Sequence, residues 1–201
     1  MDKDLQSRER LLEIAAGLFA RKGYAAVSIR EIALAAGVNS ALISYYFNGK
    51  QGLYQAVLEI EISLVLAMLD RLKQTNPDPC TFLRGYAVGL AELHIERPSL
   101  LRLISAELTN PTECFESVVR PRIRKIADDI TAAIVQGIAA GIFREDINPL
   151  LAALQLAGTV NFFFLVSPLA NAFLASDGSH RHSRQYIVQA MEVFLSGIRR
   201  N

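Results

Sequence analysis

The sequence of 201 residues contains no tryptophan, only two cysteines and almost no net charge. Cys80 and Cys114 lie 34 positions apart, and neither has a second cysteine nearby, so the sequence predicts neither a disulfide framework nor a zinc site. The 21 basic and 20 acidic side chains give a formal charge of +1, which excludes a polybasic tail and an acidic disordered protein. We therefore expect free cysteines that serve packing alone.

The motifs of common catalytic sites are missing as well. No Ser/His/Asp order, HExxH, Walker loop, GxGxxG or CxxC cluster occurs in the sequence. His180 and His182 lie in a Ser/Asp/Gly segment without a nearby thiolate or carboxylate cluster, so a solvated loop is favoured over a metal site. The prediction is a protein that is not an enzyme and that binds no metal or cofactor.

One uncharged run of 30 residues, 147–176, bears on whether the chain crosses a membrane. Its length would suffice for a span, but Asn148, Gln155 and Asn161 interrupt it, and the flanking arginines show no clear asymmetry. A helix that is apolar on all sides must be covered by something, so we favour a helix, or a broken pair of helices, buried by protein. The first residues, Met-Asp-Lys-Asp-Leu-Gln-Ser, contain no apolar signal segment, which predicts a cytoplasmic protein without a membrane partner.

Helical periodicity dominates the chain, and glycine and proline are sparse. No alternating apolar run is flanked by hairpin turns, so the predicted fold is all-α with about nine helices. The expected helices cover residues 8–22, 28–36, 39–46, 51–73, 79–96, 98–108, 116–140, 148–166 and 184–199. Pro121 fits best within the first turn of its helix, which places that start a few residues after 116.

Residues 28–46 have the pattern of a helix-turn-helix. Ser28 and Glu31 form a capping box that starts its first helix, and Asn39 offers an N-cap for its second. The motif needs a small residue where the helices touch, a residue free to adopt positive φ, and an apolar residue that fixes the second helix. The residues that meet these needs are Ala33, Gly37 and Ile43.

The outward side of the second helix then carries small and hydrogen-bonding residues: Asn39, Ser40, Ala41, Ser44 and Tyr45. Small residues allow close approach to a DNA groove, and the polar ones can bond to base edges or phosphates. A simple αα-corner in a helical bundle uses the same small–Gly–apolar spacing and remains an alternative.

A longer match favours DNA binding. Residues 10–54 resemble the DNA-binding domain of the tetracycline-repressor (TetR) family of bacterial regulators. The resemblance is carried by A-x-x-L-F-x-x-x-G-Y at 15–24, S-I-R-E-I-A at 28–33, A-G-V at 36–38 and Y-Y-F-x-x-K at 45–50. It covers about the first quarter of the chain.

The resemblance implies a homodimer that binds a near-palindromic double-stranded DNA operator, with DNA binding in residues 1–50 and effector binding and dimerisation in 51–201. Carried over by position, Tyr46 and Lys50 would contact phosphate, and Ser28 and Arg30 would contact the backbone from the preceding helix. Ser44 departs from the family, which commonly has Tyr there, so Tyr45 is a candidate for that contact.

Two further groups of residues are expected in the larger part. An apolar pocket for a hydrophobic or amphipathic effector would be lined by Tyr86, His94, Asn161, Phe162 and Phe163. For His94, capping of a helix end is an equal alternative. Because the resembled family dimerises through its last two helices, the dimer interface would include Leu156, Val160, Ile187, Met191, Phe194 and Ile198.

Together these observations predict a transcriptional regulator, specifically a ligand-released repressor. The alternative is a helical protein-interaction scaffold without specific DNA binding.

Overall fold

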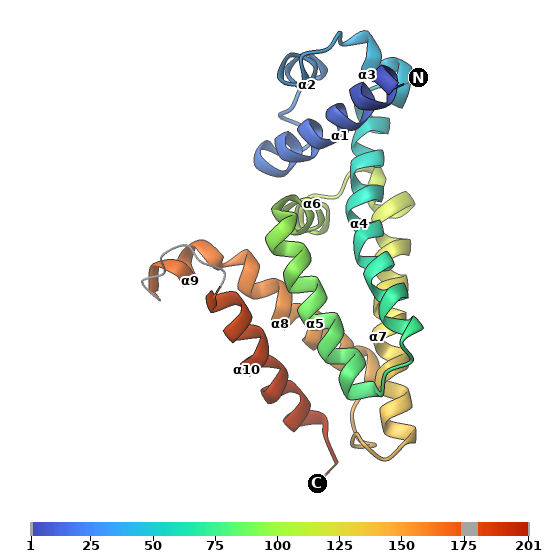
Figure 1. Ribbon diagram of the computed structural model, residues 1–201, viewed down its shortest axis with the longest axis vertical. Coiled ribbons are helices and arrows are strands. Elements are labelled where there is room, and N and C mark those ends of the chain that lie inside the picture. The colour runs from blue at the N-terminus through green and yellow to red at the C-terminus, as the bar shows by residue number, and fades with distance from the viewer. Residues whose placement is uncertain (1, 174–180, 201) are drawn as a thin grey trace. The chain divides into compact units, whose positions relative to one another are not determined.

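The computed structural model describes residues 2–173 and 181–200, and within these ranges it is helical and contains no strand (Figure 1). An isolated backbone bridge joins Phe143 to Arg199. The elements are α1 (Asp2–Lys22), α2 (Ile29–Ala36), α3 (Ala41–Phe47), α4 (Lys50–Gln74), α5 (Pro79–Glu96), α6 (Pro98–Thr109), the π-helical turn η1 (Phe115–Val119), α7 (Arg120–Ala139), α8 (Pro149–Leu165), α9 (Ser167–Phe173) and α10 (Arg181–Ile198). The predicted all-α class is confirmed.

The uncharged run forms a broken pair of helices. Asn148 caps α8 through its side-chain Oδ1, which accepts hydrogen bonds from the backbone N–H groups of Leu150 and Leu151 at 3.0 and 3.1 Å. Pro149 then occupies the first turn, where its missing N–H costs nothing. The chain leaves α8 at Val166 and continues into the short α9. Of the two histidines predicted in a solvated loop, His180 lies outside the described residues, and His182 lies in α10, which corrects the prediction for His182.

Helix α1 begins earlier than the helix expected at 8–22, and the helix expected at 116–140 is divided into η1 and α7. The start of the expected helix 116–140 lies in η1, and Pro121 lies in the first turn of α7, as the proline pattern predicts.

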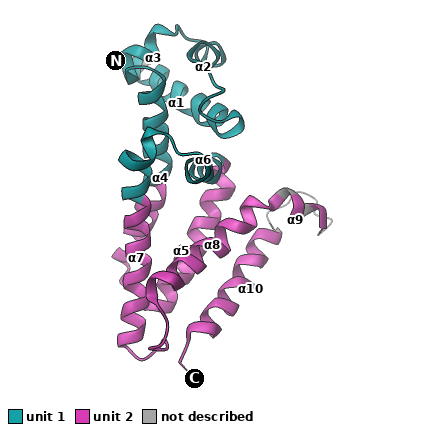
Figure 2. Cartoon of the chain, turned by 180° about the vertical axis from the view of Figure 1, so that it is seen from behind, with its two compact units in different colours: residues 1–63, 99–122 teal, residues 64–98, 123–201 magenta. Residues whose placement is uncertain are grey.

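The chain divides into two compact units (Figure 2). Unit 1 comprises residues 1–63 and 99–122, and unit 2 comprises residues 64–98 and 123–201. Helix α4 contributes residues to both units. The expected domain division at residue 50 remains a prediction, because compactness does not by itself show which part folds alone.

In unit 1, α1 packs against α2 around side chains that are almost completely buried. These include Leu11, Ala15, Phe19, Ile32, Ile43 and Leu53. The apolar stripe of α1 is the one that the sequence predicts, so burial follows directly from helical periodicity.

In unit 2, α5, α8 and α10 pack pairwise against one another. Two glycines of α5 allow close packing against the second half of α4. A Cβ at Gly85 would lie 2.7 Å from Cδ1 of Leu72, and one at Gly89 would lie 2.8 Å from Sδ of Met68. A side chain at either position would therefore displace the end of Leu72 or Met68.

One helix among the described residues is long and apolar enough to cross a membrane by length and composition, namely α4. Its most apolar stretch has a mean hydropathy of 1.6, and 44% of that stretch is buried inside the protein. Helix α8, from the uncharged run, has 17 residues and is shorter. The core helix of a globular protein meets the same criteria of length and composition as α4.

Candidate nucleic-acid interface

Helices α2 and α3 form the predicted helix-turn-helix. Ser28 Oγ accepts a hydrogen bond from the backbone N–H of Glu31 at 3.1 Å and so caps α2. Gly37 ends α2 with a φ of 65°, a left-handed conformation that glycine adopts without the usual Cβ clash. Ala33 and Ile43 are buried at 4% and 0% exposure, where the two helices pack. The roles predicted for Ala33, Gly37 and Ile43 are confirmed.

The outward face of α3 is open to solvent. Asn39 Oδ1 accepts a hydrogen bond from the backbone N–H of Ala41 at 2.8 Å, which satisfies a free amide at the start of the helix. The predicted base-facing residues Asn39, Ser40, Ala41, Ser44 and Tyr45 are all exposed. Tyr45 is 77% exposed, although it is a large aromatic residue. This face therefore combines small side chains, hydroxyls and one projecting phenol.

The predicted phosphate contacts Tyr46 and Lys50 already have partners within unit 1. The Tyr46 hydroxyl donates to Asp4 Oδ1 at 2.9 Å, and burial together with Asp4 raises the pKa of Tyr46. Lys50 Nζ donates to the backbone oxygen of Ala25 at 3.3 Å and lies 4.4 Å from the centre of the Tyr24 ring.

These partners affect the two side chains differently. An ammonium has three N–H donors, so Lys50 can hold the Ala25 carbonyl and still contact phosphate. A phenol has one proton, so Tyr46 would have to exchange Asp4 for phosphate. Ser28 keeps its hydroxyl proton for such a contact, because its oxygen accepts in the cap, and Arg30 is exposed one turn away.

A match to a family model coincides with this motif. Residues 11–57 match the model described as bacterial regulatory proteins, tetR family. This part of the chain therefore belongs to the tetR family. The transcriptional repressor NicS of Pseudomonas putida is 24% identical over 200 residues, which cover 97% of this chain and 93% of that protein. The probable transcriptional regulator YttP of Bacillus subtilis is 47% identical over 51 residues, a quarter of each chain.

The tetR-family fold extends over the whole chain. The structure of the ketosteroid transcriptional regulator KstR2 of Mycobacterium tuberculosis superposes with a TM-score of 0.77 and covers 96% of this chain and 95% of that one. Its sequence identity is 22%, so this likeness shows a shared fold and nothing more specific.

A buried acid holds unit 1 of this tetR-family chain together, and the sequence analysis missed it. Glu107 is 1% exposed and accepts hydrogen bonds from the Tyr54 hydroxyl at 2.8 Å and from the Thr112 hydroxyl at 3.0 Å. Burial and Glu107 raise the pKa of Tyr54. The signal was present, because Glu107 continues the buried stripe of Leu100 and Leu103 on α6.

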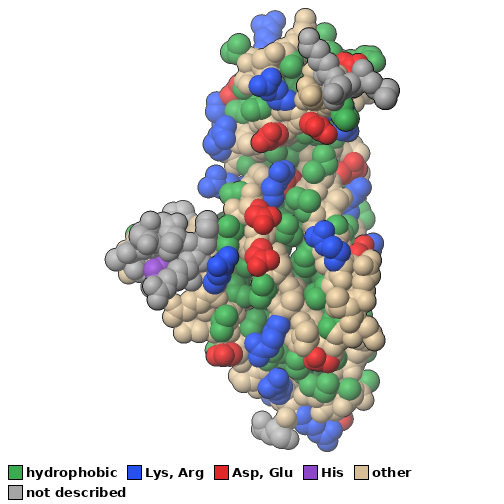
Figure 3. Space-filling model, viewed as in Figure 1, with side chains coloured by type: hydrophobic (Ala, Val, Ile, Leu, Met, Phe, Trp, Pro, Cys, Tyr) green, Lys and Arg blue, Asp and Glu red, His purple; other side chains and the backbone are tan. Residues whose placement is uncertain are grey.

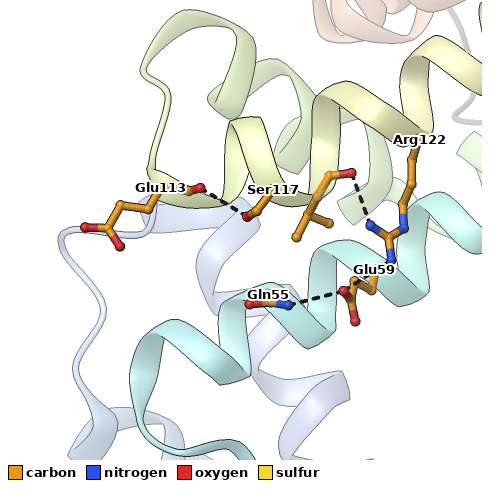
Figure 4. A network of polar contacts seen from close by, with 6 residues as sticks. Gln55, Glu59, Glu113, Ser117 and Arg122 are labelled. Carbon is orange, nitrogen blue, oxygen red and sulfur yellow. Dashed lines mark hydrogen bonds and ion pairs between the residues drawn. The ribbon is translucent and has the colours of Figure 1, made fainter.

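A second network joins α4 to η1 and α7 within unit 1 (Figure 4). Arg122 donates to Glu59 Oε1 at 3.2 Å and to the backbone oxygen of Val118 at 3.3 Å. Gln55 also donates to Glu59, at 3.3 Å. Such partly exposed ion pairs add little stability, but they fix the side chains along α4.

On the face drawn in Figure 3, basic and acidic side chains are interspersed among hydrophobic ones.

Three of the five predicted effector-pocket residues lie in the interior of unit 2. His94 and Tyr86, both on α5, are 5% and 2% exposed, and Phe163 of α8 is 8% exposed. His94 Nε2 lies 2.8 Å from Oδ1 of the half-buried Asn161, so α5 and α8 meet in a polar contact. Phe162 is 61% exposed, which corrects its prediction as a pocket residue, since adjacent residues of a helix point to different sides.

Burial of His94 predicts a pH dependence of stability. Burial lowers the pKa of His94 below its ordinary value near 6.5, against a smaller opposing effect of the Asn161 hydrogen bond. Below about pH 6.5 the unfolded chain therefore binds a proton that the folded chain excludes, so the free energy of unfolding falls by at most about 1.4 kcal/mol per pH unit. Above that pH this contribution is constant.

Urea unfolding of the wild type and of His94→Gln from about pH 8 to about pH 5.5 measures this contribution. We expect the wild type to lose more stability on acidification than the variant. Parallel pH profiles for the two proteins would contradict the assignment to His94.

Five of the six predicted dimer-interface residues are buried within the single chain, which corrects their prediction as contacts of a second subunit. Leu156, Val160, Ile187, Met191 and Ile198 are between 0% and 6% exposed within the single chain. They form the core-facing side of α8 and α10 and cannot contact a second subunit in this conformation. The sixth, Phe194, is half-buried and lines an open groove of about 370 Å³, together with Leu151, Val193 and others.

The exposed sides of the same helices carry several large apolar residues. On α8 they are Leu151, Leu154, Phe162 and Leu165, which are 54–61% exposed, and on α10 Val188 and Val193, which are 55% and 73% exposed. We call these six residues the α8/α10 stripe. Gly158 lies between them in the helical repeat, and a Cβ there would meet nothing within 4 Å.

Proposed function

We propose that this tetR-family protein is a transcriptional repressor that binds a near-palindromic operator as a homodimer and is released from it by a small apolar effector. The observation that carries the proposal is the open face of α3 on a correctly capped helix-turn-helix. Two such helices in a dimer would enter successive major grooves about 34 Å apart. The names of NicS and KstR2 as transcriptional repressors support the same function.

The exposed residues divide into two roles. Ser40, Ala41, Ser44 and Tyr45 would face base edges, because α3 presents them outward, and Asn39 would lie beside them at the start of the helix. Ser28, Arg30 and Lys50 would contact phosphates, with Tyr46 joining them after release from Asp4.

Dimerisation would use the α8/α10 stripe. A contiguous exposed apolar surface marks an interaction site, and a two-fold axis would bring two copies of the stripe face to face. The missing side chain at Gly158 would let the two α8 helices approach closely.

Effector binding would take place in unit 2. Since α4 contributes residues to both units, a ligand that favours one arrangement of unit 2 would shift the equilibrium away from the DNA-bound state. A regulator of this kind has no catalytic role and acts in the cytoplasm.

Lys50→Ala and Ser40→Ala test the two roles. We expect Lys50→Ala to weaken binding to all DNA sequences and to reduce the salt slope by about 1 per contact, because it removes a phosphate contact. Ser40→Ala should instead change sequence preference. Gel-shift titrations at several salt concentrations, on the upstream region of the gene and on unrelated DNA, measure both effects.

Lys50→Met is the matched control, because it keeps the aliphatic stem over Tyr24 and removes only the charge. It should reproduce the salt effect of Lys50→Ala. Equal effects of the alanine variants on every DNA would refute the division of roles. Absence of specific binding to any genomic DNA would favour the scaffold alternative.

A further inference from the structure

The buried face of α5 carries a polar side chain, His94, whose hydrogen-bonding capacity the described residues do not fill. His94 Nδ1 is fully buried and has no hydrogen-bond partner among the described residues. Tyr86, two turns earlier on the same helix, is 2% exposed, and burial raises the pKa of its hydroxyl. Buried polar atoms without partners are rare in folded proteins, and each requires an explanation.

The contact with Asn161 fixes what His94 can still bind. His94 Nε2 faces the amide Oδ1 of Asn161 at 2.8 Å, and an amide oxygen can only accept. Nε2 therefore carries the proton. In a neutral imidazole the other nitrogen is then an acceptor, so Nδ1 needs a hydrogen-bond donor from outside the protein.

The ring contacts of His94 and the buried α5 residues that precede it are apolar. The Phe164 ring lies 5.0 Å from the imidazole, and Phe163 beside it stacks on Tyr186 at 4.4 Å. On α5 the buried residues between Tyr86 and His94 are Ala87, Leu90 and Ala91. An ionised ligand buried here would lose its hydration without gaining a counter-charge, at a cost of several kcal/mol.

We propose that His94 and Asn161, with Tyr86, form the polar end contacts of a site for an uncharged, mostly hydrocarbon ligand whose hydroxyl group donates a hydrogen bond to His94 Nδ1. Tyr86 and His94 are eight residues apart, about 12 Å along the helix, so the ligand spans a similar length. The inference rests on the proposed function, because it makes this ligand the effector, but it concerns binding to unit 2 alone.

Three probes with one skeleton test the proposal on the full chain. 4-Pentylphenol can donate a hydrogen bond, 4-pentylanisole cannot, and 4-pentylbenzoate is charged. Isothermal titration should show the phenol binding about tenfold or more tighter than either other probe, as expected for a hydrogen bond to a buried acceptor. His94→Phe should remove the phenol's advantage over the anisole. Glu92→Gln, at an exposed position on the same helix, is the control and should leave it unchanged.

Asn161→Ala supplies a second readout if His94→Phe does not fold. Without the amide oxygen of Asn161 the proton of His94 is no longer held on Nε2, so the preference for the phenol over the anisole should become smaller. Equal binding of phenol and anisole to the wild type would overturn the proposal and leave a buried water as the partner of Nδ1. The proposal would also be overturned if the phenol still bound more tightly than the anisole to both variants. It would be overturned as well if none of the three probes bound to the wild type. Gel shifts with the same proteins test operator binding separately, so loss of DNA binding with intact phenol selectivity would refute the proposed function alone.

Discussion

Leu154→Arg is expected to leave the chain folded but monomeric. Leu154 is 54% exposed at the centre of the α8/α10 stripe, so the new guanidinium can remain in water in the monomer. In the proposed dimer two such charges would be buried against each other near the two-fold axis, and an unpaired buried charge costs several kcal/mol. Because operator binding needs two half-sites, DNA affinity should fall with the dimer.

Sedimentation measures whether the variant is monomeric, and circular dichroism measures whether it is folded. Leu108→Arg is the matched control, because Leu108 is similarly exposed, at 62%, but lies on α6 outside the stripe. It should remain dimeric. Leu156→Arg should instead unfold the protein, since Leu156 has 0% exposure inside unit 2. A dimeric Leu154→Arg protein would refute the assignment of the stripe.

Glu107→Ala should produce a large loss of stability in unit 1. The substitution removes the acceptor for the Tyr54 hydroxyl, for the Thr112 hydroxyl and for the Thr112 backbone N–H, which lies 3.2 Å from Oε2. It also leaves a cavity at a position that is 1% exposed. Buried groups left without partners cost about 1–3 kcal/mol each, so we expect a loss of about 3 kcal/mol or more.

Urea unfolding measures this loss, and two variants calibrate it. Tyr54→Phe removes one donor and leaves Glu107 bonded to Thr112, so it should cost about 1 kcal/mol. Glu113→Ala, at an exposed acid that accepts from Gln51 at 2.6 Å, should cost little. If Glu107→Ala is no more destabilising than Glu113→Ala, the buried network does not stabilise unit 1.

The helix-turn-helix was predictable because its constraints are local. A cap at Ser28, a left-handed turn at Gly37 and an apolar contact at Ile43 each depend on residues a few positions apart. The outward-facing set on α3 follows from the same periodicity, since the residues that do not pack must face outward. The existing partners of Tyr46 and Lys50 were not predictable, because Asp4 and Ala25 are 42 and 25 positions away in the chain.

The uncharged run shows where local reasoning failed. The break between α8 and α9 agrees with one of the two forms expected from its composition. The expected cover by protein is seen on one side of α8 only, because Leu154 and Phe162 are exposed on the other. Leu156 and Val160 were placed in the interface because α8 is apolar on nearly all sides, so periodicity cannot distinguish the face toward the chain's own core from the exposed one. Packing against α5 and α10 made that choice and left Leu154 and Phe162 outside.

The sequence by itself thus determined the helical class, the helix-turn-helix and the absence of common catalytic motifs, because each depends on neighbouring residues. Only the tertiary structure decided which apolar face of α8 is exposed, that Glu107 is a buried acceptor, and that His94 meets Asn161. These are contacts between side chains far apart in sequence, and their energies depend on burial, which no local pattern specifies.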